Sequence, residues 1–300
     1  MIRVAWNDKY AHPLPENHRF PMEKYQLVPE QLEHEGTVEA SAFFSPEPLS
    51  EAQILSVHDE HYWQRLKGLE LSRQEERRTG FPHSKALIER EVMIMGGTLQ
   101  CARYAIEDGV ALNVAGGTHH AYSDRGEGFC LLNDMALAAQ VLIDEGAIQR
   151  ALVVDLDVHQ GNGTAKIFEG RSEVFTFSMH GASNYPMHKE SSDLDVPLDD
   201  GTDDRTYLKL LREHLPQVMD QSEPDLVLYQ CGVDILETDK LGRLGVSEAG
   251  CRERDRLVFE ACHRNDIPVV CAMGGGYSPE IWNIVEAHCH TFRLAADYWG

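Results

Sequence analysis

From about residue 110 onward, short apolar runs alternate with longer segments in which apolar residues recur at helical spacing. This alternation is typical of βα units that build a parallel sheet. The apolar runs are almost continuous, as expected for strands that are covered by helices on both faces. The predicted strands span Val110–Ala115, Ala151–Asp157, Val174–Met179, Asp225–Cys231 and Ile267–Met273.

Helices are predicted over Asp134–Glu145, Asp204–Gln221, Glu248–Asn265 and Pro279–Ala296. Ser247 is the expected N-cap of the third helix, and Ser278 before Pro279 is the expected N-cap of the fourth. The first hundred residues are less regular, and the polar stretch from Gln74 to Thr79 is expected to be a loop. No linker or repeat separates a second unit. The pattern therefore predicts one domain over residues 1–300, an α/β fold with three α/β/α layers and a mainly parallel sheet.

Polar residues that can bind ligands or take part in catalysis collect where the predicted strands end. Ligands of open parallel sheets bind beyond the carboxyl ends of the strands. Four predicted strands run into the clusters Gly116-Gly117-Thr118-His119-His120, Val158-His159-Gln160-Gly161-Asn162-Gly163, Gly232-Val233-Asp234 and Gly274-Gly275-Gly276-Tyr277. We therefore expect His, Asp and Tyr side chains from separate segments to meet at one edge of the sheet.

Asp155, Asp157 and His159 alternate, so an extended chain would place them on one side of a strand end. Alternating acids also occur at solvated strand ends, and this segment alone does not decide between the two interpretations. Asp234 follows an apolar strand, where an acid is unusual unless it is paired, capping or coordinating. Asp157, His159 and Asp234 together supply the three protein ligands of a catalytic zinc site, with ferrous iron as the alternative metal.

A metal-bound water needs a base to remove its proton, and a departing amine needs an acid. The adjacent His119 and His120 follow a Gly-Gly turn and can provide both functions. Tyr277 follows three glycines and offers a hydroxyl donor for an oxyanion. The glycines would also suit a flexible turn or a phosphate-binding loop, but no GxGxxG or GK[ST] pattern accompanies them.

Charge and cysteine usage limit the partners. The chain has 27 Lys and Arg against 49 Asp and Glu, and its net charge of −22 would repel a nucleic-acid backbone. An acidic surface can attract cationic substrates such as lysine side chains, or it can serve only solubility. The N-terminus lacks an export signal, no apolar run approaches a membrane span, and the seven cysteines show no CxxC spacing. These features predict a cytoplasmic protein without a membrane partner.

Four segments carry a resemblance to a known family. GGTHHAYSDRGEGFCLLND, VVDLDVHQGNGT, YQCGVD and MGGGY resemble motifs of the histone deacetylase family of zinc amidohydrolases, in the same order and at similar separations. The resemblance extends over roughly Met95 to Tyr277, and HRFPMEKY is similar to the opening of class IV-like and bacterial members. It implies an arginase/deacetylase-like fold and a hydrolase that removes an acetyl or other acyl group from a lysine-like amine by attack of metal-activated water.

The resemblance also implies roles for individual residues. The implied metal ligands are Asp157, His159 and Asp234. The implied catalytic residues are His119, His120, Tyr277, Asp155 and Asn162, and the implied substrate-binding residues are Gly128, Phe129, Tyr185 and Gly275. Family members hold a structural potassium ion through backbone groups and a serine that corresponds to Ser178. Arg19 matches an arginine of an inner cavity that handles the released acid.

Asn162 departs from the nuclear members, which usually have Asp at this position. The neutral amide removes a negative charge beside His120 and should make that imidazole less basic. Asp155 should instead favour the cationic form of His119, so we expect His120 to be the neutral general base. No equivalent of the rim aspartate that grips the substrate backbone in some relatives is evident.

Several alternatives stay open from the sequence. The substrate can be an acyl-lysine in a protein or a small acylated amine such as an acetylpolyamine, and the oligomeric state is undetermined. A non-catalytic acyl-lysine binding module would have lost a ligand or Tyr277, and an arginase-like enzyme with two manganese ions would need bridging aspartates that CGVDILETD lacks. Packing roles are expected for the remaining candidates His58, His61, Cys130, Cys231, His288, Cys289 and His290.

Overall fold

The computed structural model describes residues 2–300 and is built around one eight-stranded sheet in which all paired strands are parallel. The strand order is β2-β1-β3-β8-β7-β4-β5-β6. The strands span β1 (Arg3–Ala5), β2 (Phe43–Phe44), β3 (Val110–Asn113), β4 (Ala151–Asp155), β5 (Val174–Gly181), β6 (Leu194–Leu198), β7 (Leu226–Gln230) and β8 (Val269–Ala272). The predicted α/β class with a parallel sheet is confirmed.

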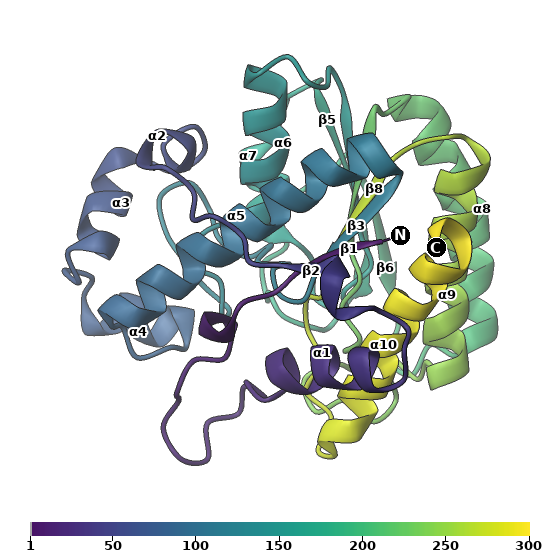
Figure 1. Ribbon diagram of the computed structural model, residues 1–300, viewed down its shortest axis with the longest axis horizontal. Coiled ribbons are helices and arrows are strands. Elements are labelled where there is room, and N and C mark those ends of the chain that lie inside the picture. The colour runs from purple at the N-terminus through teal and green to yellow at the C-terminus, as the bar shows by residue number, and fades with distance from the viewer. Residues whose placement is uncertain (1) are drawn as a thin grey trace.

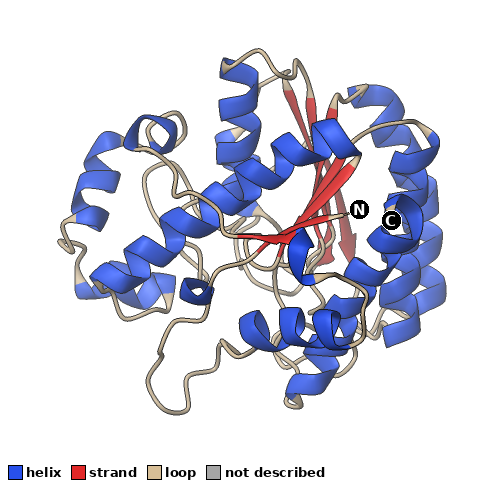
Figure 2. Cartoon of the chain, viewed as in Figure 1, coloured by secondary structure: helices blue, strands red, loops and turns tan. Residues whose placement is uncertain are grey.

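Helices cover the two faces of this sheet (Figures 1 and 2). On one face α5 (Lys85–Asp108) packs against β1, β3 and β8, with α6 (Asp134–Asp144) beside it. On the other face α8 (Asp204–Ser222) packs against β4 and β5, and α10 (Ile281–Trp299) packs against β3. The remaining helices are α1 (Lys24–His34), α2 (Glu51–Ile54), α3 (Glu60–Lys67), α4 (Arg73–Thr79), α7 (Asn162–Ile167) and α9 (Glu248–Arg264), with short 3-10 turns at Asp8–Tyr10 and Ala40–Ala42.

The elements predicted after residue 110 are all present, with boundaries that shift by a few residues. Ser247 caps α9, since its hydroxyl accepts the Gly250 N–H at 3.1 Å. The prediction for Ser278 was wrong. The helix α10 begins at Ile281 after Glu280, and the Ser278 hydroxyl is instead hydrogen-bonded to that of Thr238 at 2.8 Å.

The loop predicted from Gln74 to Thr79 was also wrong, because these residues belong to helix α4. The sequence contains a capping box that explains the helix: the Ser72 hydroxyl accepts the Glu75 N–H, and the Glu75 carboxylate accepts the Ser72 N–H at 2.8 Å. Arg65 of α3 adds an ion pair to Glu75 at 2.7 Å. These contacts hold a polar segment in a helix that its composition does not suggest.

The buried apolar side chains form one contiguous core that extends from Ile2 to Ala295. All residues of β3, β4, β7 and β8 are buried, which accounts for their continuous apolar runs. Within residues 2–300, no helix is both long and apolar enough to cross a lipid bilayer. Since the central strands are parallel, their carboxyl ends lie at one edge of the sheet, and the site described next is built there.

Candidate active site

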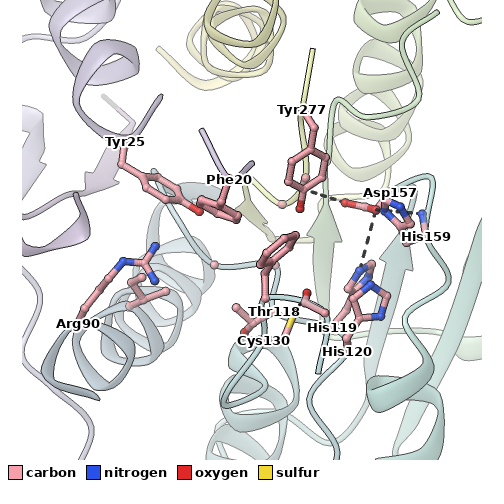
Figure 3. A pocket seen from close by; sticks show the side chains of 17 residues that line it. Phe20, Tyr25, Arg90, Thr118, His119, His120, Cys130, Asp157, His159 and Tyr277 are labelled. Carbon is pink, nitrogen blue, oxygen red and sulfur yellow. Dashed lines mark hydrogen bonds and ion pairs between the residues drawn. The ribbon is translucent and has the colours of Figure 1, made fainter. Parts of the chain in front are cut away.

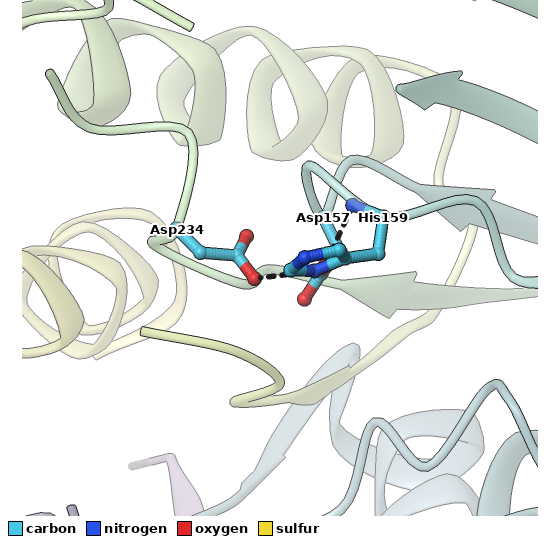
Figure 4. A group of neighbouring side chains, drawn as sticks. All are labelled: Asp157, His159 and Asp234. Carbon is cyan, nitrogen blue, oxygen red and sulfur yellow. Dashed lines mark hydrogen bonds and ion pairs between the residues drawn. The ribbon is translucent and has the colours of Figure 1, made fainter. Parts of the chain in front are cut away.

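Three of the predicted residues meet beyond the ends of β4 and β7 (Figure 4). The Nδ1 atom of His159 lies 3.0 Å from Oδ1 of Asp157 and 3.0 Å from Oδ2 of Asp234. All three side chains are buried. One imidazole nitrogen and two carboxylates therefore point into a common centre, which is a donor set suited to a divalent ion such as zinc.

The electrostatics of this cluster favour a cation at its centre. Burial and the negative charge of Asp157 raise the pKa of Asp234 to about 7. Burial alone would lower the pKa of His159, but Asp234 and Asp157 outweigh it and raise this pKa to about 10. The buried carboxylates thus bind positive charge strongly, and a divalent ion would supply it without a proton.

Two glycines make room for the carboxylates. A Cβ atom on Gly275 would lie 2.0 Å from Oδ2 of Asp234, and one on Gly232 would lie 2.1 Å from Oδ2 of Asp157. The Gly275 N–H also donates to Oδ2 of Asp157 at 2.9 Å. Gly275 was predicted to bind substrate, and the geometry shows that its backbone also orients a candidate metal ligand.

His119 and His120 lie side by side next to Asp157, with ring centroids 4.2 Å apart (Figure 3). The Nδ1 atom of His119 is 2.6 Å from Oδ2 of Asp155, and the Nδ1 atom of His120 is 2.6 Å from Oδ1 of Asn162. Both histidines therefore present Nε2 as the free ring nitrogen. Nε2 of His119 lies 4.0 Å from Oδ1 of Asp157, so the pair borders the candidate metal site.

The two histidines differ in basicity. Burial alone would lower the pKa of His119, but the charge of Asp155 and its hydrogen bond raise it to about 9. Burial and the neighbouring positive charges of His119 and His159 lower the pKa of His120 well below its usual value. Asn162 accepts a hydrogen bond from His120 without adding charge. The raised pKa of His119 and the lowered pKa of His120 agree with the expectation that His119 is cationic and His120 is the neutral base.

The orientation of the Asn162 amide is determined by its other partners. Its Nδ2 donates to the Tyr122 hydroxyl at 2.9 Å and to Oε1 of Glu127 at 2.7 Å. Because both amide hydrogens are used in this way, Oδ1 faces His120 and Nδ1 of that ring must be the donor. Glu127 therefore fixes the tautomer of His120 through Asn162, a role that the sequence alone does not reveal.

The Tyr277 ring reaches the same cluster from the loop after β8 (Figure 3). Burial raises the pKa of the Tyr277 hydroxyl well above its usual value, so this group stays protonated and able to donate. Asp239 accepts the Tyr277 N–H at 2.6 Å, and the buried Lys24 ammonium donates to the Gly274 carbonyl at 2.8 Å. Lys24 and Asp239 therefore position this loop, and neither was recognised in the sequence.

Phe129, Tyr185 and Gly128, which were expected to bind substrate, line a cleft next to the site. The Tyr185 ring packs edge-on against His120 at a centroid distance of 4.9 Å, and its hydroxyl donates to Glu127 at 2.9 Å. Gly128 has a φ of +57°, and a Cβ at this position would lie 2.6 Å from Cδ2 of His120. Glycine is thus required at position 128 for the loop to pass the imidazole.

The approach leads into an inner cavity of about 40 Å³ that also touches Ile94 and Cys130. Arg19 was expected in this inner cavity, and that expectation was wrong, because Arg19 is exposed and lines the outer cleft. The buried Arg90 of α5 occupies the inner position instead. Figure 3 shows Arg90 and Tyr25 at the end of the cavity away from His159.

Ser178, the serine expected beside a potassium ion, pairs in register with Asp155 across β5 and β4. Among the residues expected to pack, His58, Cys231, His288 and Cys289 are buried, whereas His61 is exposed and His290 lies beside Glu248 and Glu286. Both ring nitrogens of His58 are hydrogen-bonded to backbone groups of Tyr122 and Asn133. Burial raises the pKa of the Cys130 and Cys231 thiols, which makes them poor nucleophiles.

Comparisons with known proteins identify a family to which the chain is similar. The family model described as the histone deacetylase domain matches residues 18–292. An uncharacterized protein from Picosynechococcus sp. is 42% identical over 296 residues, which cover 99% of each chain. Histone deacetylase 2 of Arabidopsis thaliana is 33% identical over 269 residues, which cover 87% of this chain and 70% of that protein.

Solved structures show the same fold. The crystal structure of an HDAC homolog complexed with SAHA superposes with a TM-score of 0.84 at 24% identity and covers 99% of this chain and 84% of that one. An HDAC homolog from Aquifex aeolicus gives a TM-score of 0.83 at 24% identity, with 97% and 82% covered. The family model spans most of the chain and the Arabidopsis thaliana relative exceeds 30% identity, so the chain belongs to the histone deacetylase family.

Proposed function

We propose that this protein is a zinc-dependent hydrolase that removes an acetyl or other acyl group from a lysine-like amine. Membership of the histone deacetylase family supports a hydrolase of the deacetylase type. The observation that carries the proposal is the buried cluster of Asp157, His159 and Asp234 beside the histidine pair and Tyr277. Asp157, His159 and Asp234 would hold the metal, with zinc expected and ferrous iron as the alternative.

A metal bound there would polarise the substrate carbonyl and lower the pKa of a bound water. The protein's own groups would then move the protons. His120, held neutral by its surroundings, accepts the proton of the attacking water at Nε2. His119, whose cationic form Asp155 stabilises, donates from Nε2 to the departing amine. The Tyr277 hydroxyl donates to the oxygen on which negative charge develops.

Further parts of the proposal follow from the same residues. We propose that residues 1–300 are a single catalytic domain, and the contiguous core that runs from Ile2 to Ala295 supports this. A potassium ion near Ser178 and the backbone around Asp155 would stabilise the strand ends that carry the site. The seven cysteines are all unpaired, which suits the reducing cytoplasm.

The test combines metal analysis with turnover. The purified full chain should contain one zinc or iron ion. It should release acetate from an acetyl-lysine peptide or from an acetylated polyamine, and the faster of the two reactions shows whether the substrate is a protein or a small amine. Asp157→Ala, His159→Ala and Asp234→Ala should each lose metal and activity, whereas Asp220→Ala, on the exposed side of α8, should lose neither. Normal metal content in all three cluster variants would refute the site. Full metal content with binding but no hydrolysis of any acyl-amine would instead indicate a binding module.

A further inference from the structure

The mouth of the candidate active site is basic, although the chain as a whole carries a net charge of −22. Arg19, Arg77 and Arg78 line the outer cleft together with His120, His159 and Tyr277. All three arginines are exposed. Within residues 2–300, none of their guanidinium groups has a carboxylate within 4.0 Å or a hydrogen-bonding partner. Three guanidinium groups that have no ion-pair or hydrogen-bonding partner among residues 2–300 therefore line the space through which a substrate must pass.

The backbone holds these arginines at the mouth. The Arg78 carbonyl accepts the Gly128 N–H at 3.0 Å, and the Thr79 carbonyl accepts the Phe129 N–H at 2.8 Å, which joins the end of α4 to the channel wall. The Arg19 guanidinium lies over the Phe129 ring, 5.0 Å from its centroid. Arg19 and Arg78 thus contact the Gly128–Phe129 segment that lines the channel, and Arg77 precedes Arg78 in the same helix.

The two carboxylates nearest the mouth are held by other protein groups, and neither lines the outer cleft. The Glu127 carboxylate accepts hydrogen bonds from Asn162 and Tyr185. Asp239 accepts the backbone N–H groups of Leu241, Gly242 and Tyr277. Among the residues that line the cleft, the permanently charged side chains are therefore the three arginines.

We propose that the preferred substrate is an acylated amine that carries a carboxylate on its amine side. This inference rests on the proposed hydrolase function and adds the charge of the substrate to it. The acyl group and the amide enter the inner site, so the part of the molecule left in the outer cleft is the part attached to the amine. Arginine binds carboxylates through two parallel hydrogen bonds, and three arginines around one cleft favour such a group over a neutral or cationic one. The carboxylate belongs to a free acylated amino acid or to an acidic residue beside an acyl-lysine.

The test compares substrates that differ only in charge: 6-acetamidohexanoate, its carboxamide, and N-acetyl-1,6-diaminohexane. In the full chain with its metal we expect kcat/KM to be about tenfold higher for the carboxylate than for the carboxamide, and lowest for the ammonium compound. The triple variant Arg19→Gln/Arg77→Gln/Arg78→Gln should reduce the ratio of carboxylate to carboxamide to about twofold or less. A matched control, Arg205→Gln/Lys209→Gln/Arg252→Gln, removes the same charge from exposed positions on α8 and α9 and should keep the preference.

Hydrolysis of the neutral carboxamide tests the proposed function. The ratio of kcat/KM for the carboxylate to kcat/KM for the carboxamide tests the preference for a carboxylate. If no compound is hydrolysed, the dissociation constants of the three compounds for Tyr277→Phe, measured by calorimetry, test the charge preference without turnover. An acetyl-lysine peptide with flanking glutamates, compared with its glutamine analogue, shows whether the carboxylate lies on a peptide or on a free amino acid. The proposal would be overturned if the carboxylate and the carboxamide gave equal kcat/KM and equal dissociation constants, or if the ammonium compound were preferred. It would also be overturned if the triple arginine variant kept the preference for the carboxylate.

Discussion

Replacing Asn162 by Asp should make His120 more basic, and the structure gives the size of the effect. Nδ1 of His120 lies 2.6 Å from Oδ1 of Asn162, which places the centre of an introduced carboxylate about 4 Å from the ring charge. At an effective dielectric constant of about 20, this attraction amounts to about 4 kcal/mol, or about 3 pKa units. Desolvation of the new carboxylate opposes the shift, so we expect a net rise of about 1 to 2 units.

Glu127 complicates the single substitution. Its Oε1 accepts a hydrogen bond from the Asn162 amide at 2.7 Å, so an Asp at this position would face a second carboxylate at the same distance. The two acids would share one proton, and part of the new charge would be lost. The double variant Asn162→Asp/Glu127→Gln restores a donor to that contact and should show the full shift. Glu127→Gln alone is the matched control.

The assay is the pH dependence of kcat/KM for the parent and these variants. A general base must be neutral, so activity falls as the pH drops below its pKa, and raising the pKa of His120 moves this acidic limb to higher pH. A cation at the candidate metal site would lower the pKa of both imidazoles, but their partners Asp155 and Asn162 would still differ in charge. An unmoved acidic limb in the single and double variants, together with substantial activity in His120→Ala, would refute this assignment and make His119 the base.

Three further substitutions test the loops around the site. Tyr277→Phe should fold and keep its metal but lose about 3 kcal/mol of transition-state stabilisation, measured as a fall in kcat, and parental activity would contradict the role of the hydroxyl. Lys24→Met removes the donor to the Gly274 carbonyl and should cost about 1 to 3 kcal/mol in urea unfolding and lower kcat, whereas unchanged stability and kcat would show that the contact is dispensable. Gly128→Ala should lower kcat/KM, because the added methyl group meets the His120 ring, and unchanged kinetics would show that the loop can move aside.

The parallel sheet and its site edge could be predicted because their residues carry local signals. Continuous apolar runs indicated β4 and β7, and each run leads directly to a candidate ligand, Asp157 or Asp234. The carboxyl ends of parallel strands share one edge, so the clustering followed from the topology. The order of strands and polar residues along the chain was therefore enough to predict that these side chains meet in space.

The first hundred residues were harder to interpret because their structure depends on distant partners. The helix α5 contains Gly96 and Gly97, which interrupt its apolar pattern. A Cβ on Gly96 would lie 1.9 Å from the Glu47 carbonyl oxygen, and one on Gly97 would lie 2.3 Å from the Tyr10 hydroxyl. These glycines permit close packing against segments far away in sequence, a reason that no local pattern can show.

The supporting residues of the site were missed for a related reason. Lys24 contacts a carbonyl 250 positions away, and a lone lysine in the first turn of a helix is normally exposed. Arg90 reaches the inner cavity from a long helix, although arginine is seldom buried, and Arg19 was expected there in its place. Sequence motifs identify residues that do chemistry, but they contain little information about the buried charges that hold those residues in position.

The charge of the cleft illustrates why a net charge cannot predict substrate preference. The 49 acidic residues are distributed over the whole chain, and at physiological ionic strength a charge is largely screened beyond about 8 Å. A ligand in the outer cleft meets Arg19, Arg77 and Arg78, and no Asp or Glu is among the residues that line this cleft. The acidic composition therefore argues against binding to an extended polyanion, which would cover a large area of surface, while a single carboxylate in the cleft is attracted. The preference should accordingly weaken as salt is added, because exposed arginines act through screened charge.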